Sequence, residues 1–376
     1  MKSKKYIWIH VVVALIVSLQ LNAQEKSEPI PAVGLAIKAG SNFERIDFNR
    51  HAVGENDIEI EILYAGICHS DFMVRGAHQH VVPGHEIVGR VTKVGDKVTK
   101  FKKGDYAGVG CMVNSCGHCE YCEAGKEQYC KERTVFTYGS PDRFHDGQIT
   151  QGGYSNIITV SERFGINVPK KADIKRVAPL MCAGITTWSP IKFSDVKKDD
   201  VVGVAGFGGL GHMAVQYLVD LGAKVTVFDI TDEKETDAKR LGAERYVNVA
   251  TTKDFSNLSD TFDFIISTIP ADYDPMMYVK MLKMGGGELA FVGLPPNSNI
   301  SISPFVLQSA HRYVYGSLIG GIPETQEMLD YSVANNIYPE VEIIEAKPEE
   351  VDKAYEKIDA GEVKFRYVID MRTIEK

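Results

Sequence analysis

A glycine-rich run between an apolar strand and an apolar helix constrains the fold more than any other feature of this sequence. Residues 201–205 are predicted to form a buried strand, and residues 212–221 carry apolar side chains at helical spacing. Between them stand Gly206, Gly208 and Gly211, in the spacing G-x-G-x-x-G. The first glycine permits a tight turn, the second lets a ligand approach the backbone, and the third lets the helix pack closely on the strand. A pyrophosphate can then meet the free N–H groups at the helix start. The sequence therefore predicts a dinucleotide-binding unit within a parallel α/β sheet.

The end of the next strand indicates which dinucleotide is bound. Residues 224–228 are predicted to form a second strand that ends at Asp229. A carboxylate at this place accepts a hydrogen bond from the 2'-OH of an adenosine ribose and repels a 2'-phosphate. We therefore expect NAD(H) to be favoured, with NADP(H) as the alternative. Thr231 and Lys234 are the groups that could meet a 2'-phosphate instead, and Asp229 could also be an exposed strand-end residue without this role.

Four of the seven cysteines form one compact cluster. Cys116, Cys119, Cys122 and Cys130 have the spacing C-x2-C-x2-C-x7-C. Four thiolates at such spacing can complete the tetrahedral shell of a structural Zn2+. A pair of disulfides is the alternative interpretation. We expect a closed zinc site that holds a loop and performs no chemistry.

The remaining cysteines suggest a second metal site. Cys68, His85 and the distant Cys182 make a Cys2His set, which is typical of a catalytic zinc with one open position. Open coordination lets zinc act as a Lewis acid on an alcohol or carbonyl oxygen. Cys182 alone would be an ordinary buried core residue. Cys111, the seventh cysteine, is expected to be a buried free thiol.

Longer motifs around these residues resemble those of the zinc-dependent medium-chain alcohol dehydrogenases. The resemblance is to the cinnamyl-alcohol-dehydrogenase branch and its bacterial broad-specificity aldehyde reductases, and it covers the chain from about Ile30 to its end. The motifs, in the family's order and spacing, are 66–71, 83–89, 182–187, 316–320 and 363–370. The fold that this resemblance implies is α/β, with a GroES-like β-rich catalytic domain plus a Rossmann doubly wound parallel sheet.

The resemblance also implies that both ends of the chain build the catalytic domain. We expect this domain to comprise residues 24–184 and 321–376, with a structural zinc lobe at about 111–131, and the Rossmann domain to comprise 185–320. Short Val/Ile strands broken by glycine support the first part, and strand–helix–strand alternation after about residue 188 supports the second. The further strands predicted are 58–63, 87–94, 105–109, 262–266 and 288–292.

Site roles follow from positions in the family. Ser70 is expected to hydrogen-bond the substrate oxygen and pass its proton toward the ribose, and His69 to lie near the cofactor phosphates. Asp71 is expected to orient His85 by accepting its other N–H. Glu86 is placed with the ligands of the catalytic zinc, because it can approach the metal. The cofactor contacts implied are Gly206, Gly208, Gly209, Leu210, Gly211, Asp229, Lys234, Thr268 and Gly293.

One departure from the family concerns proton release. Many relatives carry a histidine where this chain has Met73, and methionine cannot move a proton. The proton must therefore leave through water or another group, with His69, His78 and His80 as candidates. Slower proton release or a shifted pH optimum is expected, while hydride transfer need not change.

The substrate is expected to be a primary alcohol or its aldehyde with an apolar or aromatic group. Phe72, Met73, Phe136 and Trp188 are the expected pocket wall, because they flank the zinc motifs or fall near the family's pocket positions. Such side chains would leave the hydroxyls of a polyol unpaired. Some of the four could instead pack in the core.

The predicted function is therefore a zinc-dependent dehydrogenase that carries two zinc ions per chain and moves hydride between NAD(P) and an alcohol. A polyol dehydrogenase, a zinc-free quinone-reductase-like relative and a non-catalytic redox-sensing relative are the alternatives. A formal net charge of −8, without a Lys/Arg run beyond the first five residues, disfavours a nucleic-acid partner. The resemblance implies a homodimer.

The N-terminus differs from the rest of the chain. Residues 1–5 are basic, residues 7–21 are nearly all apolar, and Ala23 precedes a polar run. This pattern predicts a secretory signal peptide over residues 1–23, with an uncleaved anchor as the alternative. We therefore expect export to the periplasm, or a cytoplasmic protein if the segment is not functional. Cysteine-ligated zinc suits a reducing cytosol better, which leaves the two expectations in tension.

Overall fold

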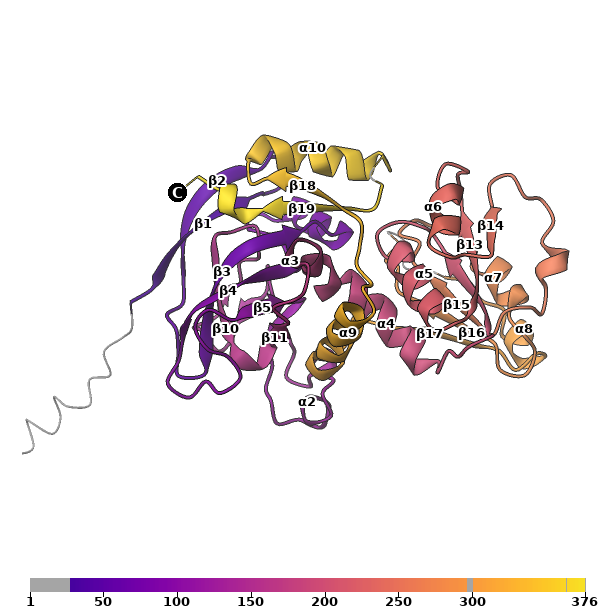
Figure 1. Cartoon of the computed structure of the whole chain (residues 1–376), viewed down its shortest axis with the longest axis horizontal. Coiled ribbons are helices and arrows are strands. Elements are labelled where there is room, and N and C mark those ends of the chain that lie inside the picture. The colour runs from indigo at the N-terminus through magenta and orange to yellow at the C-terminus, as the bar shows by residue number, and fades with distance from the viewer. Residues whose placement is uncertain (1–27, 296–299, 363, 376) are drawn as a thin grey trace, which may run out of the picture.

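A computed structural model describes residues 28–295, 300–362 and 364–375. Two lobes lie side by side, each built on its own β-sheet (Figure 1). The predicted signal peptide, residues 1–23, lies outside the described residues. In the part of the chain that is described, no helix is long and apolar enough to cross a membrane.

The first lobe, here called the β-rich lobe, is built on a seven-stranded sheet. Its order is β11-β5-β4-β3-β19-β18, and β10 pairs with β3 outside this path. The strands are β3 (Asp57–Gly66), β4 (Ile87–Val94), β5 (Tyr106–Val109), β10 (Ile157–Ser161), β11 (Gly165–Val168), β18 (Val341–Glu345) and β19 (Arg366–Asp370). Because β19 pairs with β3, with Val368 opposite Gly66, the end of the chain completes a sheet that its beginning started.

Smaller elements surround this sheet. Three two-stranded ribbons are formed by β1 (Ile30–Ala36) with β2 (Glu44–Arg50), β6 (Met112–Asn114) with β7 (Val135–Phe136), and β8 (Pro141–Asp142) with β9 (Gln148–Ile149). The helices of this lobe are α2 (Glu120–Glu123), α3 (Ile174–Val177), α10 (Pro348–Asp359), and the 3-10 helices η1 (His69–Gly76), η2 (Glu127–Tyr129), η3 (Glu162–Phe164), η4 (Ala178–Met181) and η6 (Met371–Thr373).

The second lobe is a parallel sheet, the Rossmann sheet, with the order β14-β13-β12-β15-β16-β17. The strands are β12 (Val201–Ala205), β13 (Lys224–Asp229), β14 (Arg245–Asn248), β15 (Phe264–Ser267), β16 (Glu288–Phe291) and β17 (Tyr313–Gly316). The helices are α5 (Gly211–Asp220), α6 (Glu235–Arg240), α7 (Met276–Met281), α8 (Pro304–Gln308) and the 3-10 helix η5 (Ser256–Leu258). The strand order reverses at β12, which is where sheets of this kind bind a dinucleotide.

The strand predictions agree with this architecture because buried parallel strands are continuous apolar runs. The bounds of β4 and β12 are those predicted, and β13, β15 and β16 differ by one or two residues. The strand predicted from residue 262 begins at Phe264, because Phe262 pairs only as an isolated bridge with Leu282.

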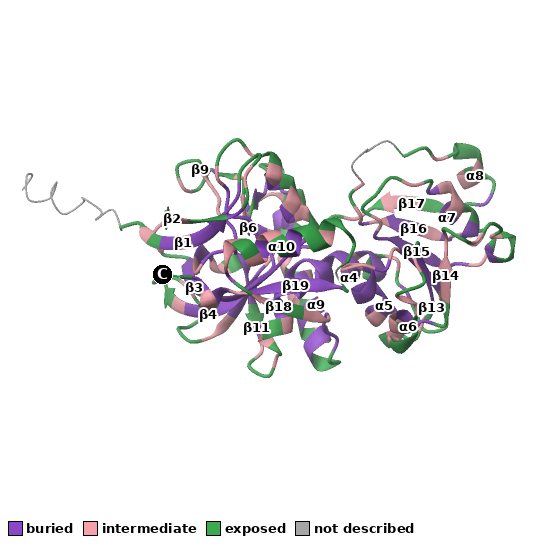
Figure 2. Ribbon diagram, turned by 90° about the horizontal axis from the view of Figure 1, so that it is seen from above, coloured by how far each residue is buried: buried purple, intermediate pink, exposed green. Residues whose placement is uncertain are grey.

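Two helices join the lobes, α4 (Ala183–Phe193) and α9 (Ile322–Ala334), and both lie between the two sheets in Figure 1. One buried apolar cluster runs from Val88 of the β-rich lobe through Ile185 of α4 to Val204 of the Rossmann sheet. Figure 2 shows this buried band continuing through α4 and α5. The seam between the lobes is therefore part of the hydrophobic core.

Candidate active site

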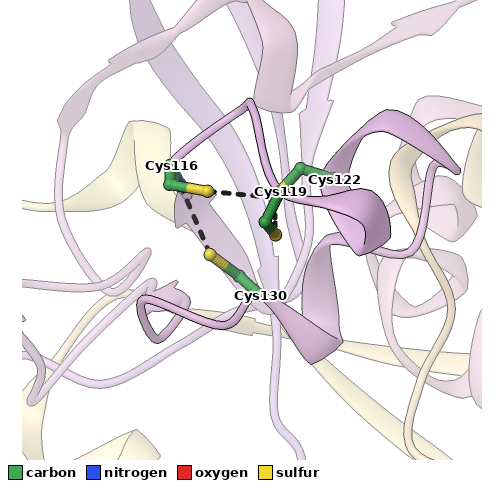
Figure 3. A group of neighbouring side chains, drawn as sticks. All are labelled: Cys116, Cys119, Cys122 and Cys130. Carbon is green, nitrogen blue, oxygen red and sulfur yellow. Dashed lines mark hydrogen bonds between the residues drawn. The ribbon is translucent and has the colours of Figure 1, made fainter.

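The four clustered cysteines converge in the loop between β6 and β7 (Figure 3). Cys119 and Cys122 stand at the start and inside of α2, and their Sγ atoms are 3.6 Å apart. The Sγ atoms of Cys116 and Cys122 are 3.8 Å apart, and all four thiols lie within 4.8 Å of one another. A tetrahedron of sulfurs about 2.3 Å from a zinc ion has edges of about 3.8 Å. All seven cysteines are free, so the cluster has the geometry of a metal site and not of a disulfide staple.

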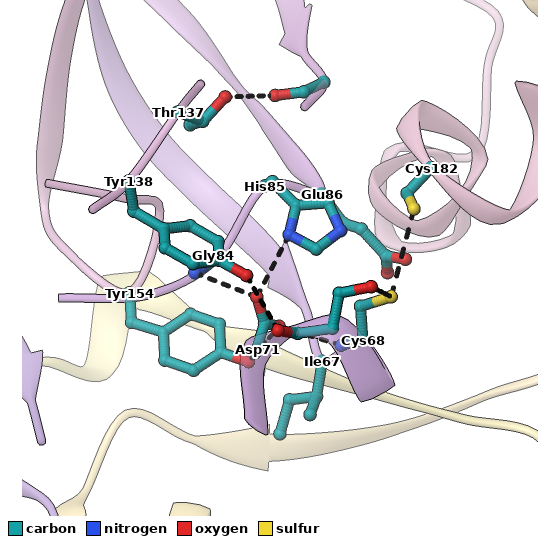
Figure 4. A network of polar contacts seen from close by, with 12 residues as sticks. Ile67, Cys68, Asp71, Gly84, His85, Glu86, Thr137, Tyr138, Tyr154 and Cys182 are labelled. Atoms are coloured by element: carbon teal, nitrogen blue, oxygen red, sulfur yellow. Dashed lines mark hydrogen bonds and ion pairs between the residues drawn. The ribbon is translucent and has the colours of Figure 1, made fainter. Parts of the chain in front are cut away.

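The second predicted set also converges, and all its members are buried (Figure 4). Cys68 precedes η1, His85 and Glu86 precede β4, and Cys182 lies between η4 and α4. Their ligand atoms lie within 4.8 Å of one another, and the Sγ atoms of Cys68 and Cys182 are 3.9 Å apart. The hydrogen bond with Cys182 lowers the pKa of the Cys68 thiol, which favours a thiolate there. The donor set of two sulfurs and one imidazole fits Zn2+.

Asp71 accepts hydrogen bonds that position two members of this cluster, His85 and Cys68. Its Oδ1 accepts from His85 Nδ1 at 3.0 Å, and its Oδ2 accepts from the backbone N–H of Cys68 at 2.9 Å and from Tyr154 Oη at 2.8 Å. Asp71 has no exposed surface. A histidine that donates Nδ1–H to a carboxylate presents its Nε2 lone pair to a metal, so Asp71 occupies the orienting position expected from the sequence.

Glu86 is paired with Arg366, which was not among the predicted site residues. Its Oε1 accepts from Arg366 Nη1 at 3.0 Å, while its Oε2 is buried without a hydrogen-bond partner among the described residues. Arg366 also donates to the Ile67 carbonyl at 3.1 Å, and its Nε has no hydrogen-bond partner in the described part of the chain. A Cβ on Gly209 would meet this Nε at 2.6 Å, so Arg366 lies between the metal cluster and the glycine-rich loop. It was the one arginine in the motif 363–370, which is the signal that could have identified it.

The residues at the start of η1 lie around the cluster. Ser70 Oγ is 3.8 Å from Cys68 Sγ, and the backbone carbonyl of Ser70 accepts from Tyr138 Oη at 3.1 Å. His69 is exposed, and its ring stacks on Phe72 with centroids 5.1 Å apart. Met73 is 73% exposed. Ser70 thus brings a hydroxyl to Cys68, as Thr186 does to Cys182, with its Oγ1 4.0 Å from that Sγ.

The expected pocket wall is only partly supported. Trp188 is buried and packs on Tyr217 and Tyr331, so its assignment to the wall is wrong: α4 turns it into the core between the lobes. Phe136 is 41% exposed and lies near the four-cysteine loop. Phe72 stacks on Tyr355 at 4.2 Å between centroids, next to η1.

Cys111 differs from the expectation of an isolated buried thiol. It is only partly buried, and hydrogen bonds with Cys182 and His85 lower the pKa of its thiol to about 6. Cys111 follows strand β5, which ends at Val109, and therefore lies at the edge of the second metal cluster. Sequence spacing alone did not show this neighbourhood.

The glycine-rich loop has the predicted geometry. Gly206 has φ +88°, which a side chain would disfavour, and a Cβ on Gly211 would lie 2.0 Å from the Gly206 carbonyl oxygen. A Cβ on Gly208 would meet nothing within 4 Å, so its surroundings are open to a ligand. The Leu210 backbone begins α5 as its N-terminal cap residue. The loop is therefore shaped by backbone contacts at its ends and open in its middle.

Two further predicted cofactor residues contribute to this shape. Thr268 Oγ1 donates to the carbonyls of Ala205 at 3.1 Å and Gly206 at 3.0 Å, which holds the loop in place. A Cβ on Gly293 would lie 2.2 Å from the Ile269 carbonyl oxygen, so only glycine fits there. Both residues lie at the carboxyl ends of neighbouring strands, β15 and β16.

Asp229 is engaged by the backbone. One carboxylate oxygen accepts from the N–H of Phe207 at 2.7 Å and the other from the N–H of Ile230 at 2.7 Å, and the residue is 8% exposed. By contrast, Thr231 Oγ1 is buried without a partner among the described residues, and partly buried Lys234 precedes α6. Both oxygens of Asp229 therefore hold the loop backbone, and each keeps a second lone pair that a ribose hydroxyl could use.

A dinucleotide-type parallel sheet beside a buried Cys2His set defines the class of zinc-binding dehydrogenases. Residues 54–170 match the family described as alcohol dehydrogenase GroES-like domain, and residues 209–334 match the one described as zinc-binding dehydrogenase. The chain belongs to the zinc-dependent alcohol dehydrogenase family. It is an oxidoreductase of alcohols and aldehydes that uses a nicotinamide cofactor.

Named relatives agree with this assignment. The chain is 43% identical to aldehyde reductase YahK of Escherichia coli, over 92% of this chain and 99% of that protein. It is 42% identical to NADP-dependent alcohol dehydrogenase C 1 of Mycolicibacterium smegmatis, over 90% of this chain and 97% of that protein. The solved structure of CAD from Helicobacter pylori, complexed with NADP(H), has a TM-score of 0.86 and 48% identity, and the match covers 93% of this chain and 100% of that one.

Proposed function

We propose that this protein interconverts primary alcohols and aldehydes that carry apolar or aromatic groups, with aldehyde reduction as the physiological direction. The observation that carries the proposal is the position of Arg366, which pairs with Glu86 of the buried Cys2His cluster and abuts Gly209 of the glycine-rich loop. One side chain therefore contacts both the metal site and the dinucleotide loop, so the two sites adjoin, and hydride transfer requires the substrate carbon and the nicotinamide to lie close together.

The chain supplies ligands for two zinc ions. Cys68, His85 and Cys182 would bind the catalytic zinc, and the four-cysteine loop would bind the structural one. Bound zinc supplies a Lewis acid for the substrate oxygen, and the nicotinamide supplies or accepts the hydride. Ser70 is placed to hold the proton of the substrate oxygen, and Arg366, with its unpartnered Nε, is placed to meet the cofactor pyrophosphate.

Steady-state kinetics with benzaldehyde, cinnamaldehyde, butanal and sorbitol test the substrate class. We expect each aldehyde to be reduced with a higher kcat/KM than that of sorbitol oxidation. Higher efficiency on sorbitol would support a polyol dehydrogenase. No turnover of any of the four, in protein that contains two zinc ions per chain, would support a redox-sensing relative.

For the cofactor, the support now favours NADP(H) over the expected NAD(H). The Thr231 hydroxyl, which has no hydrogen-bond partner among the described residues, and Lys234 lie just beyond β13, where a 2'-phosphate would need donors, and a relative of similar length is named NADP-dependent. Lys234→Met should lower kcat/KM for NADPH at least tenfold and leave that for NADH within about threefold, since one charge contact to a phosphate is lost. Lys253→Met, at an exposed lysine, is the matched control. A tenfold preference of the unchanged enzyme for NADH would refute this assignment.

Proton release is proposed to pass from Ser70 to water. Met73 is exposed and carries no titratable group, and exposed His69 stacks on Phe72. Met73→His should raise the rate of alcohol oxidation below pH 8 if a relay limits it. His69→Gln distinguishes proton release through water from release through His69, because only the second would be slowed by that change.

A homodimer is proposed through the edge strand β17, which pairs only with β16 among the described strands. Phe193 and Leu318 lie exposed next to it, at 75% and 46% of their surface. Light scattering should give twice the chain mass, and Leu318→Glu should shift the protein toward monomer. A monomeric unchanged protein would contradict the proposal.

Export is proposed from the sequence alone, because residues 1–23 have the basic, apolar and small-residue order of a signal peptide. Fractionation of the native cells and mass spectrometry of the purified protein would test it. A mature chain that begins near Gln24 supports cleavage, and an intact Met1 in the cytoplasm contradicts it.

A further inference from the structure

Two histidines form a stacked pair in the β-rich lobe and belong to neither cysteine site. His51 follows β2, and His145 lies in the turn between β8 and β9, the hairpin labelled at β9 in Figure 2. Their ring centroids are 3.5 Å apart and their planes differ by 11°. The side chains are 20% and 25% exposed, so the pair is mostly covered but can be reached from solvent.

The hydrogen bonds of the pair leave both Nε2 atoms with a free lone pair. His51 Nδ1 is 2.9 Å from the carbonyl oxygen of Ala52, which can only accept, so Nδ1 carries the proton. His145 Nδ1 is 2.6 Å from Asp142 Oδ2, and it donates to that carboxylate. A ring that donates one N–H to a carbonyl or carboxylate is the usual arrangement of a metal-binding histidine.

Carboxylates surround the pair. Ligand atoms of His51, Asp142 and His145 all lie within 4.8 Å of one another, and Asp57 Oδ2 is 3.9 Å from His51 Nδ1. The neighbouring guanidinium of Arg50 is directed elsewhere, since it donates to the carbonyls of Ile157, Gln151 and Gly152 and to Ser155 Oγ. Arg50 also lines the cavity beside the pair, and the two carboxylates of Asp57 and Asp142 outnumber its one positive charge.

A small cavity adjoins the pair. Its volume is about 50 Å³, and its lining includes His51, Asp142, His145 and Thr159. A single water needs about 10–15 Å³ of such space, so an ion and one or two waters fit. Thr159 Oγ1 is buried there without a hydrogen-bond partner in the described structure, which leaves a polar atom for a bound water to satisfy.

We propose that His51 and His145 bind a divalent transition-metal ion through their Nε2 atoms, with Asp142 holding the His145 ring. Two imidazoles and a nearby carboxylate suit Zn2+, Ni2+ or Cu2+ better than Mg2+ or Ca2+. An imidazole binds a metal in its own plane, so the parallel rings must open when the ion enters. Asp142 and His145 lie on the same hairpin between two-residue strands, so they can shift together and keep their hydrogen bond as the rings open. This site is independent of the proposed enzymatic function.

Equilibrium dialysis of the full chain, with its cysteine-bound zinc in place, tests the site with Zn2+ as the probe. Free Zn2+ is raised to about 100 µM, where complexes of micromolar affinity are filled. We expect one zinc per chain above the starting content. His51→Gln and His145→Gln should each weaken this extra binding at least tenfold, and Asp142→Asn by about 10–100-fold, as expected of an orienting carboxylate.

His311→Asn is the matched control, because His311 is exposed and its φ of +50° suits asparagine. It should bind the extra zinc as the unchanged protein does. Anomalous scattering from a Zn2+-soaked crystal should place a peak between His51 and His145. Extra zinc that binds equally to all the variants, or no extra zinc up to that concentration, would overturn the proposal. Circular dichroism and aldehyde turnover of each variant show that it is folded.

Discussion

At the scale of single residues, the two cysteine sets should respond differently to the same substitution. Cys182→Ala removes a ligand from the open set, so we expect turnover to fall at least about 100-fold with little change in melting temperature. Cys119→Ala removes a ligand from the four-cysteine structural site. Metal binding there contributes folding free energy, so we expect the melting temperature to fall instead. Zinc content, turnover and thermal unfolding measure the contrast. Cys111→Ala, next to the open set, is the control and should keep two zinc ions. Full turnover in Cys182→Ala would contradict the assignment.

His212 should make the protein sensitive to mild acid. It is fully buried and stacks on Phe365, and burial lowers its pKa to about 3. Between pH 6.5 and about 3 the unfolded chain therefore holds a proton that the folded chain does not, so stability falls as the pH falls. The slope from this one group is about 1.4 kcal/mol per pH unit.

Denaturant unfolding of the unchanged protein and of His212→Gln, at several pH values between 5 and 7, measures this effect. The difference between the two slopes cancels the contribution of groups that both proteins share, the zinc thiols included. We expect the difference to grow steadily below pH 6.5. Parallel pH profiles would show that the pKa of His212 is the same in the folded and the unfolded chain.

The sequence predicted those site residues whose type is required by metal binding. The four-cysteine cluster converged as its spacing indicated, and the second cluster converged as the family motifs implied. The partners of those residues were not predictable. Arg366 reaches Glu86 across 280 positions, and the turn of Asp229 toward Phe207 depends on the loop path. Long-range pairings of this kind leave no local pattern in one sequence.

At the scale of elements, substitutions at two glycines of the glycine-rich loop should have different effects, one on stability and the other on cofactor binding. Gly211→Ala places a Cβ 2.0 Å from the Gly206 carbonyl oxygen, so the helix start must shift. We expect a loss of about 1–3 kcal/mol in unfolding free energy. Gly208→Ala meets nothing within 4 Å, so stability should change by less than about 0.5 kcal/mol, while KM for the cofactor rises. Thermal unfolding and cofactor titration of both variants check the contrast, and equal stability losses would argue against it.

Elements with a strong internal pattern were also the ones predicted well. β12 is apolar throughout and β15 is apolar up to Ser267, because strands of a parallel sheet are covered on both faces. The ribbons β6–β7 and β8–β9 were missed, since strands of two or three residues have no periodicity to detect. The missed hairpin β8–β9 is the one that carries His145.

At the scale of the whole molecule, Arg366 connects the two lobes, and its removal should affect both. Arg366→Met leaves Glu86 buried without its partner, which costs about 3–5 kcal/mol for pairs of this kind. It also removes the cation beside Gly209, so KM for the cofactor should rise at least tenfold. Glu86→Gln combined with Arg366→Met should recover stability but not cofactor affinity. Recovery of both would show that Arg366 acts only through Glu86.

The pairing of β19 with β3 has a consequence for how the protein is made. Arg366 donates to the Ile67 carbonyl across 299 positions, so the sheet beneath Cys68 and Asp71 is completed only when β19 has left the ribosome. At about 5–20 residues per second, synthesis of the intervening chain takes roughly 15–60 s. During that interval the Rossmann sheet can fold, because all its strands lie between residues 201 and 316. Nascent chains should therefore acquire nucleotide affinity before the Cys68–Cys182 pair is closed, and an arrested chain ending before β19 should expose both thiols to alkylation.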